Sequence, residues 1–128
     1  SRKRKGSAMM RFDHLTILTT DLQESWDFYR ALPDAEVSSP EDGYFEVSFH
    51  ESVIGVFHLV TFAEATKTSP TQSGGAVIQF SVDDVDEYWS KLPTAYRQNG
   101  SSPQKMPWHT YSGYISDPDG NILEFYKS

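Results

Sequence analysis

The sequence predicts an α+β protein built from two copies of one βαβββ unit, and two observations lead to this prediction. The first is an internal repeat: "HLTILTTDLQESW" (14–26) and "VIQFSVDDVDEYW" (77–89) align with their apolar residues in register. Both stretches begin with the alternation of a strand and then change to the spacing of a helix. The second is that "VFHLV" (56–60) overlays "ILEFY" (122–126). The chain of 128 residues is therefore interpreted as two units of about sixty residues each.

The first unit is expected over residues 10–62. Alternation in residues 11–19 predicts a strand, and Thr20 or Asp21 is a suitable N-cap for the helix that follows. Leu32-Pro33 ends this helix, because the residue before a proline disfavours helical backbone. The rest of the unit is expected to hold two or three strands.

The second unit is expected over residues 76–128 and repeats this pattern. The turn "DPDGN" (117–121) predicts a hairpin, since Pro118 fixes φ and Gly120 accepts a positive φ. The polar segment 63–75 is rich in Ser, Thr and Gly and is interpreted as the linker between units. The elements expected in this unit are a strand at 76–82, a helix from about 84 to 97, and strands around 102–106, 109–116 and 121–127.

Composition excludes several classes of protein. Residues 1–9, which begin "SRKRKGSA", are interpreted as the remnant of an expression tag or a disordered arm, before a single domain over 10–128. Without the four basic residues of that segment, seven Lys and Arg face 18 Asp and Glu, which leaves a net charge near −11. Such a surface repels phosphate backbones, so nucleic acid is not expected as a partner. Cysteine is absent, which excludes disulfides and thiolate sites. No stretch resembles a membrane span, and a soluble, cytoplasmic protein is expected.

Each helix can cover only one face of its sheet, so the other face is left open and two units together enclose a cup within a mostly antiparallel arrangement. Alternation along the strands predicts which polar side chains face this cup. We expect Tyr114 to lie across the hairpin from Glu124. The other residues expected to face the cup are His14, Thr16, His58, Val77, Gln79 and Tyr126.

These features together resemble the vicinal oxygen chelate superfamily, which includes glyoxalase I, bleomycin-resistance proteins, extradiol dioxygenases and methylmalonyl-CoA epimerases. The resemblance covers residues 10–127 and rests on "FDHLTILTTDLQESWDFYRAL", "AVIQFSVDDVDEYWSKL" and "YSGYISDPDGNILEFY". It implies the cupped fold of that family and a homodimer, with the site built within one chain or across two. It also implies that the family's metal-ligand positions are His14, His58, Val77 and Glu124.

The residues at those four positions leave two functions open. Val77 stands where metal-binding members of the family have a histidine, and His58 where they have Glu or Gln. The first function is therefore a metal-free cup that binds a small molecule, as in bleomycin-resistance members, with Glu124 hydrogen-bonded to a neighbouring histidine. The alternative is a metal-dependent lyase, isomerase, transferase or dioxygenase. In that case His14, His58 and Glu124 would bind Zn²⁺, Fe²⁺, Mn²⁺ or Ni²⁺, which would act as a Lewis acid on two substrate oxygens.

The candidate catalytic residues are Glu124 and Tyr114, and Gln79 or Tyr114 could orient a substrate or carry a proton. Aromatic side chains near the mouth of the cup would supply apolar surface for a ligand. The residues expected to line the substrate pocket are Thr16, Val77, Gln79, Trp108, Tyr111 and Tyr126. The identity of the substrate does not follow from the sequence.

Overall fold

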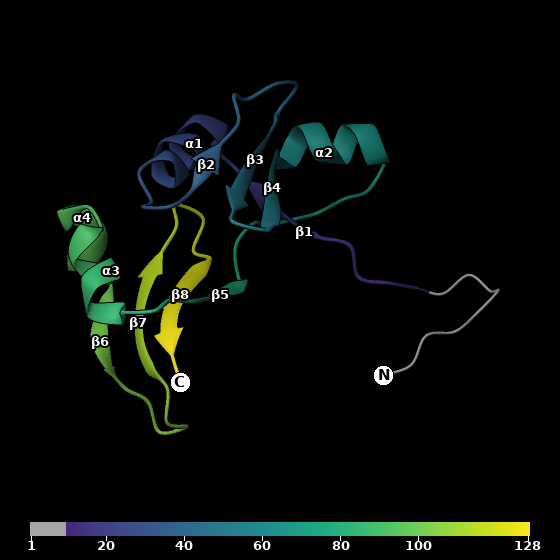
Figure 1. Ribbon diagram of the computed structural model, residues 1–128. Coiled ribbons are helices and arrows are strands. Elements are labelled where there is room, and N and C mark those ends of the chain that lie inside the picture. Colours follow the sequence, from purple (N-terminus) through teal and green to yellow (C-terminus); the bar gives the residue numbers. More distant parts are fainter. Residues whose placement is uncertain (1–9) are drawn as a thin grey trace.

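The computed structural model describes residues 10–128, and the tag remnant expected at residues 1–9 lies outside the described residues. Two four-stranded sheets form, with strand orders β1-β4-β3-β2 and β5-β8-β7-β6 (Figure 1). The elements are β1 (Leu15–Thr19), α1 (Leu22–Arg30), β2 (Glu36–Val37), β3 (Tyr44–Phe49), β4 (Ser52–His58), α2 (Leu59–Thr66), β5 (Val77–Ser81), α3 (Val85–Lys91), α4 (Thr94–Gln98), β6 (Ser101–Lys105), β7 (Tyr111–Ser116) and β8 (Ile122–Lys127).

The predicted pair of βαβββ units is confirmed. In each unit the first strand pairs in parallel with the last, β1 with β4 and β5 with β8. The remaining neighbours, β2–β3, β3–β4, β6–β7 and β7–β8, are antiparallel. Two parallel strands cannot be joined by a tight turn and need a longer crossover connection. In each unit the helix and the two middle strands form that connection between the first strand and the last.

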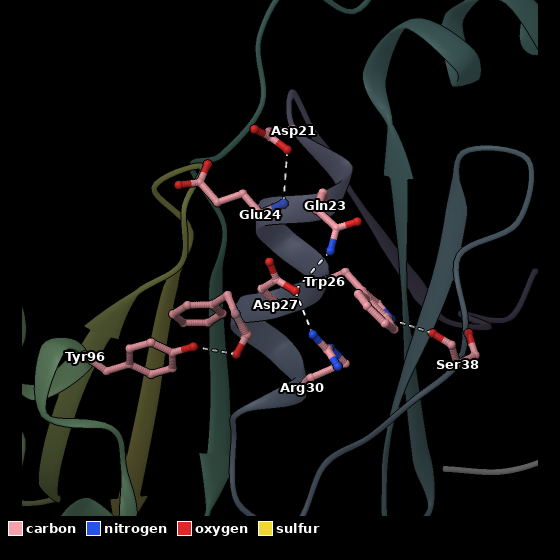
Figure 2. A network of polar contacts seen from close by, with 9 residues as sticks. Asp21, Gln23, Glu24, Trp26, Asp27, Arg30, Ser38 and Tyr96 are labelled. Carbon is pink, nitrogen blue, oxygen red and sulfur yellow. Dashed lines mark hydrogen bonds and ion pairs between the residues drawn. The ribbon is translucent and has the colours of Figure 1, made fainter.

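Helix α1 begins where the sequence predicts. Asp21 is extended, and its carboxylate accepts a hydrogen bond from the backbone N–H of Glu24 at 3.0 Å, which caps the helix (Figure 2). The indole N–H of Trp26 donates to the carbonyl oxygen of Ser38 at 2.9 Å and so fastens the helix to the segment after β2. The buried side of the helix consists of Ser25, Phe28 and Tyr29.

The helix expected over residues 84–97 is two helices in the structure, α3 and α4. Asp84 caps α3 by accepting from the backbone N–H of Glu87 at 3.0 Å, as Asp21 does in α1. Leu92 then adopts an extended ψ of 149°, because it precedes Pro93. Within residues 10–128, no helix is long and apolar enough to cross a membrane.

The end of the first unit also differs from the prediction. The strand interpreted from "VFHLV" stops at His58, and α2 begins at Leu59, so the segment 63–75 starts inside a helix. The rings of Phe57 and Phe62 lie 5.3 Å apart, which packs α2 against the end of β4. A short apolar run fits a strand or a buried helix equally well, so periodicity alone could not distinguish the two.

One hydrophobic core joins the two units. Phe28 of α1 stacks on Tyr96 of α4 with ring centroids 4.4 Å apart, and the Tyr96 hydroxyl donates to the carbonyl oxygen of Phe28 at 2.8 Å (Figure 2). The Tyr88 hydroxyl likewise donates to the carbonyl oxygen of Pro33 at 2.8 Å. Each of these contacts joins a residue of one unit to a residue of the other, so aromatic packing fixes how the units sit together.

The Asp119 clasp, formed by Thr20, Ser25, Ser73 and Asp119, adds a polar connection. Figure 1 shows the turn between β7 and β8 reaching the end of the first unit that holds α1. There the Asp119 carboxylate accepts hydrogen bonds from Thr20 N and Oγ1, from Ser25 Oγ and from Ser73 Oγ, at 2.8–3.2 Å. Burial alone would raise the pKa of Asp119, but the hydrogen bonds to its carboxylate outweigh burial and lower the pKa.

Replacing Asp119 by alanine is expected to lower the free energy of unfolding by about 1–2 kcal/mol and to flatten its dependence on pH. A carboxyl group whose pKa is lowered by folding stabilises the fold above its unfolded pKa, near 3.8, and that stabilisation is lost as pH falls through the folded pKa. Urea unfolding of wild type and Asp119→Ala from about pH 5 down to about pH 2 measures the difference, with Asp83→Ala as an exposed control. Parallel pH curves for wild type and Asp119→Ala would contradict the prediction.

Candidate functional site

We define the open face of a sheet as the side turned away from α1 or α3. On the open face of the second sheet, Gln79 pairs with Glu124 across β5 and β8, and Tyr114 pairs with Glu124 across β7 and β8. The Gln79 amide Nε2 donates to Glu124 Oε1 at 2.9 Å, and the Tyr114 hydroxyl donates to Glu124 Oε2 at 3.1 Å. These three residues are the Glu124 group, and Tyr114 lies opposite Glu124 as the sequence analysis expected.

Burial differs sharply within the Glu124 group. Glu124 is only 4% exposed, whereas Gln79 is exposed and Tyr114 half-buried. A carboxylate can only accept hydrogen bonds, so the amide nitrogen of Gln79 must face Glu124 and the amide oxygen must face away. A ligand on this face would therefore meet Gln79 and Tyr114, while Glu124 orients them from below.

The hydroxyl of Tyr114 stays protonated in this environment. Burial is the largest cause that raises the pKa of Tyr114, and the Glu124 carboxylate also raises it, although Ser112 acts in the opposite direction. A phenol with a raised pKa donates a hydrogen bond at neutral pH and does not act as a base. Because its one hydrogen is directed at Glu124, the Tyr114 oxygen can hold a ligand by accepting a hydrogen bond from it.

A hollow of about 610 Å³ lies where the two units adjoin, and Gln79 belongs both to it and to the Glu124 group. His14 and Val77, the first positions of the two repeats, share this junction hollow. Its charged residues are mostly acidic, and His14 Nδ1 donates to Asp13 at 2.8 Å. The lining residues are Phe12, Asp13, His14, Leu15, Glu46, Glu51, Ser52, Val53, Ile54, Val77, Ile78 and Gln79.

The prediction that His58 faces the cup is wrong. His58 pairs with the buried Thr19 and lies two residues after the buried Val56, so it shares the face of Val56 and not the open face. The strand pairings show which residue of the first unit occupies the position equivalent to Glu124. Gln79 pairs with Glu124 in the second unit, and Thr16, which matches Gln79, pairs with Gly55 in the first.

Gly55 is required by the residues that crowd over it. A Cβ atom at this position would lie 2.7 Å from both Thr16 Oγ1 and the Tyr44 hydroxyl. The Tyr44 hydroxyl itself donates to Glu46 Oε2 at 3.0 Å. In the first unit a phenol therefore fills the space that the Glu124 carboxylate occupies in the second.

The donor set of this chain does not fit the metal site that the family resemblance implies. The four equivalent positions hold His14, Gly55, Val77 and Glu124, and a metal that needs three protein ligands has only two candidates there. Both oxygens of Glu124 already accept hydrogen bonds from neutral donors. Among residues 10–128, no three His, Cys, Asp or Glu side chains are grouped closely enough to hold a metal ion.

The remaining predicted pocket residues are divided among different places. Thr16 and Tyr126 lie on the open faces, Tyr126 paired with Ser112 and Thr16 with Gly55. The prediction for Tyr111 is wrong: it alternates with Ser112 onto the opposite face, where its hydroxyl donates to Asp86 at 2.7 Å. Trp108 is 62% exposed and is not part of the junction hollow.

Glu46 is a residue of this site that the sequence analysis did not include. It pairs with Gly55 and lines the junction hollow. The alternation of "YFEVSF" in β3 places Tyr44 and Glu46 on one face, so the pattern that identifies them is present in the sequence. The mistaken repeat alignment through His58 concealed it.

Two βαβββ units, each with a parallel pairing of its first and last strands, define the glyoxalase-type fold. The chain belongs to the Glyoxalase/Bleomycin resistance protein/Dioxygenase superfamily, whose sequence model matches residues 11–125. No match was found among curated proteins.

Solved structures show the same fold at low sequence identity. A glyoxalase/bleomycin resistance protein/dioxygenase from Nocardioides superposes with a TM-score of 0.77 at 18% identity, over 96% of this chain and 86% of that one. A glyoxalase-related enzyme from Fulvimarina pelagi gives 0.74 at 19% identity, over 94% and 89%. The hypothetical protein SA1046 from S. aureus gives 0.72 at 19% identity, over 94% and 96%. At these identities the likeness concerns the fold alone.

Proposed function

We propose that this chain binds a small organic molecule in the junction hollow without a metal ion, and that Gln79 accepts a hydrogen bond from it. The observation that carries this proposal is the orientation of Gln79. Its amide nitrogen is held by Glu124, so its carbonyl oxygen is presented to the hollow as an acceptor.

The charges around the hollow support the same class of ligand. Asp13, Glu46 and Glu51 line it, and His14 is its one basic side chain among the described residues. An anionic ligand would be repelled, whereas a neutral or cationic molecule with N–H or O–H groups matches the acceptors. The metal-dependent enzyme has no comparable support, because Gly55 and Val77 occupy two of its four positions.

Binding of benzamide and benzoate to ¹⁵N-labelled protein tests this proposal, since the two are similar in size and only benzamide offers N–H donors. Benzamide is expected to shift the resonances of Val77 and of the Gln79 side chain, and benzoate is not. Gln79→Ala should weaken benzamide binding about five- to ten-fold, the effect of one hydrogen bond, while Gln104→Ala on β6 should not. Equal binding of both molecules, or binding that Gln79→Ala leaves unchanged, would contradict the assignment.

Metal analysis separates this function from the metal-dependent alternative. Protein purified without a His tag should hold well below one equivalent of Zn, Fe, Mn or Ni. A content near one equivalent that falls in His14→Ala or Glu124→Ala would favour the enzyme instead.

The homodimer that the family resemblance implies is part of the same proposal. Leu15, Val53 and Val77 line the junction hollow and are 40%, 38% and 60% exposed. A second copy over this side would remove that apolar surface from water. Sedimentation equilibrium measures the association directly.

A further inference from the structure

A second cavity, the interunit cleft, lies between the two units and shares no lining residue with the junction hollow. Its volume is about 700 Å³. It takes residues from the connection between α1 and β2, from β2 itself, from the ends of β3 and β5, and from α3 and β8. The lining residues are Pro33, Asp34, Ala35, Glu36, Phe49, His50, Phe80, Ser81, Val82, Tyr88 and Phe125.

Four aromatic rings form one connected surface in this cleft. Phe125 is only 2% exposed and lies at its base, whereas the other three rings are half-buried. Phe80 lies 5.4 Å from Phe125 and 4.8 Å from Phe49, measured between ring centroids, and Tyr88 lies 4.6 Å from Phe125. The rings come from four separate elements, so the tertiary fold alone brings them together.

The rim of the interunit cleft is acidic. Asp34 and Glu36 line it, and neither forms an ion pair with any of residues 10–128. An adjoining hollow shares Asp34, Ser81, Val82 and Tyr88 with it and adds Asp83, Asp84, Glu87 and Lys91. The basic groups nearby are already next to acids, Lys91 at 4.0 Å from Glu87 and His50 at 3.7 Å from Glu51.

The charge of Asp34 acts on the aromatic surface itself. The Tyr88 hydroxyl donates to the carbonyl oxygen of Pro33, and burial, followed by the Asp34 carboxylate, raises the pKa of Tyr88. Tyr88 therefore stays neutral, with its hydroxyl engaged and its ring available for contact. Asp34 has a left-handed backbone with φ of 66°, a conformation that asparagine also accepts readily.

We propose that the interunit cleft binds a compact organic cation, an alkylated ammonium group. Aromatic faces attract cations through their quadrupole, most strongly where the site is partly desolvated. The unpaired carboxylates on the rim add attraction for the same charge and repel anions. A neutral apolar ligand would use the rings and gain nothing from Asp34 and Glu36. This site is independent of the junction hollow and of the function proposed for it.

Choline and its neutral isostere 3,3-dimethyl-1-butanol test the proposal, because they differ in shape by little more than one nitrogen replaced by carbon. In titrations of ¹⁵N-labelled protein, choline is expected to shift the amide resonances of Ala35, Phe49, Val82 and Tyr88. It should bind at least about five-fold more tightly than the alcohol. Equal affinity, no binding by choline, or shifts confined to the junction hollow would overturn the proposal.

Matched variants locate the effect. Phe80→Leu keeps an apolar side chain and removes the ring, and it should weaken choline binding about five-fold or more. Asp34→Asn should weaken it about two- to five-fold at low salt, with less effect at high salt. Asp42→Asn is the control, since Asp42 is also left-handed with φ of 53° and the same charge is removed away from the cleft. Equal effects of Asp34→Asn and Asp42→Asn would show that only net charge matters and would refute the site.

Discussion

Replacing Asp117 by alanine is expected to lower the free energy of unfolding by about 3–5 kcal/mol, because several buried donors lose one shared acceptor. The carboxylate of Asp117 is 5% exposed and accepts hydrogen bonds from the backbone N–H groups of Asp119 and Asn121 and from the Asn121 side chain. It also accepts from the hydroxyl of Tyr29, at 2.7 Å. The Tyr29 bond joins α1 of the first unit to the hairpin turn of the second.

The environment of Tyr29 explains why this loss is large. Tyr29 is 1% exposed, and burial, followed by the Asp117 carboxylate, raises the pKa of Tyr29 well above its usual value. Without Asp117 the buried hydroxyl has no acceptor in its place, and an unsatisfied buried group costs about 1–3 kcal/mol. Urea unfolding monitored by circular dichroism measures the change.

The controls for Asp117→Ala separate its hydrogen bond to Tyr29 from its hydrogen bonds within the hairpin turn. Asp117→Asn keeps an acceptor oxygen and should lose less, and a double-mutant cycle with Tyr29→Phe isolates the bond between the units. Asp83→Ala, an exposed acid, should change stability by less than about 0.5 kcal/mol. A loss below about 1 kcal/mol for Asp117→Ala would mean that water satisfies the donors and that the network is not structural.

Replacing Phe125 by alanine is expected to lower the free energy of unfolding by about 3–5 kcal/mol, the usual cost of a buried aromatic ring and the cavity left behind. Phe125 is 2% exposed and packs against Phe80 and Tyr88, with ring centroids 5.4 and 4.6 Å away. The chain around it is held by strand pairing, so the site cannot fully collapse. Thermal and urea unfolding of the variant measure the loss.

Phe12→Ala is the matched control for Phe125→Ala, since Phe12 is 84% exposed and its removal should change stability by less than about 0.5 kcal/mol. Phe125→Leu should lose less than alanine, because it refills part of the cavity. Similar losses for Phe12→Ala and Phe125→Ala would mean that the aromatic cluster is not part of the core.

Local signals in the sequence were sufficient to predict the two βαβββ units. The repeat of 14–26 in 77–89 and the caps at Asp21 and Asp84 each depend on neighbouring residues, and the structure has them in place. The pairing of Tyr114 with Glu124 followed from the hairpin turn between them. These features can be predicted from the sequence because strand alternation and helix capping depend on residues only a few positions apart.

The sequence pattern predicted the wrong register for the last strand of the first unit relative to the last strand of the second. "VFHLV" and "ILEFY" share an apolar pattern, and that pattern does not record how many residues each unit inserts before its last strand. Only the pairing of β4 with β1 shows that Gly55, three residues before His58, matches Glu124. A shift by an odd number of residues moves every side chain to the other face of the sheet. The position equivalent to Glu124 is therefore Gly55, and His58 lies on the opposite face.

The amino-acid sequence by itself determined the two βαβββ units, their helix caps and the acidic, cysteine-free character of the chain. Only the tertiary structure decided which polar groups meet: Gln79 and Tyr114 on Glu124, and four rings from separate elements at the interunit cleft. The physical reason is the distance along the chain over which each kind of interaction acts. Alternation and capping depend on adjacent residues, whereas strand register and the packing of one unit on the other depend on contacts between residues far apart in the chain.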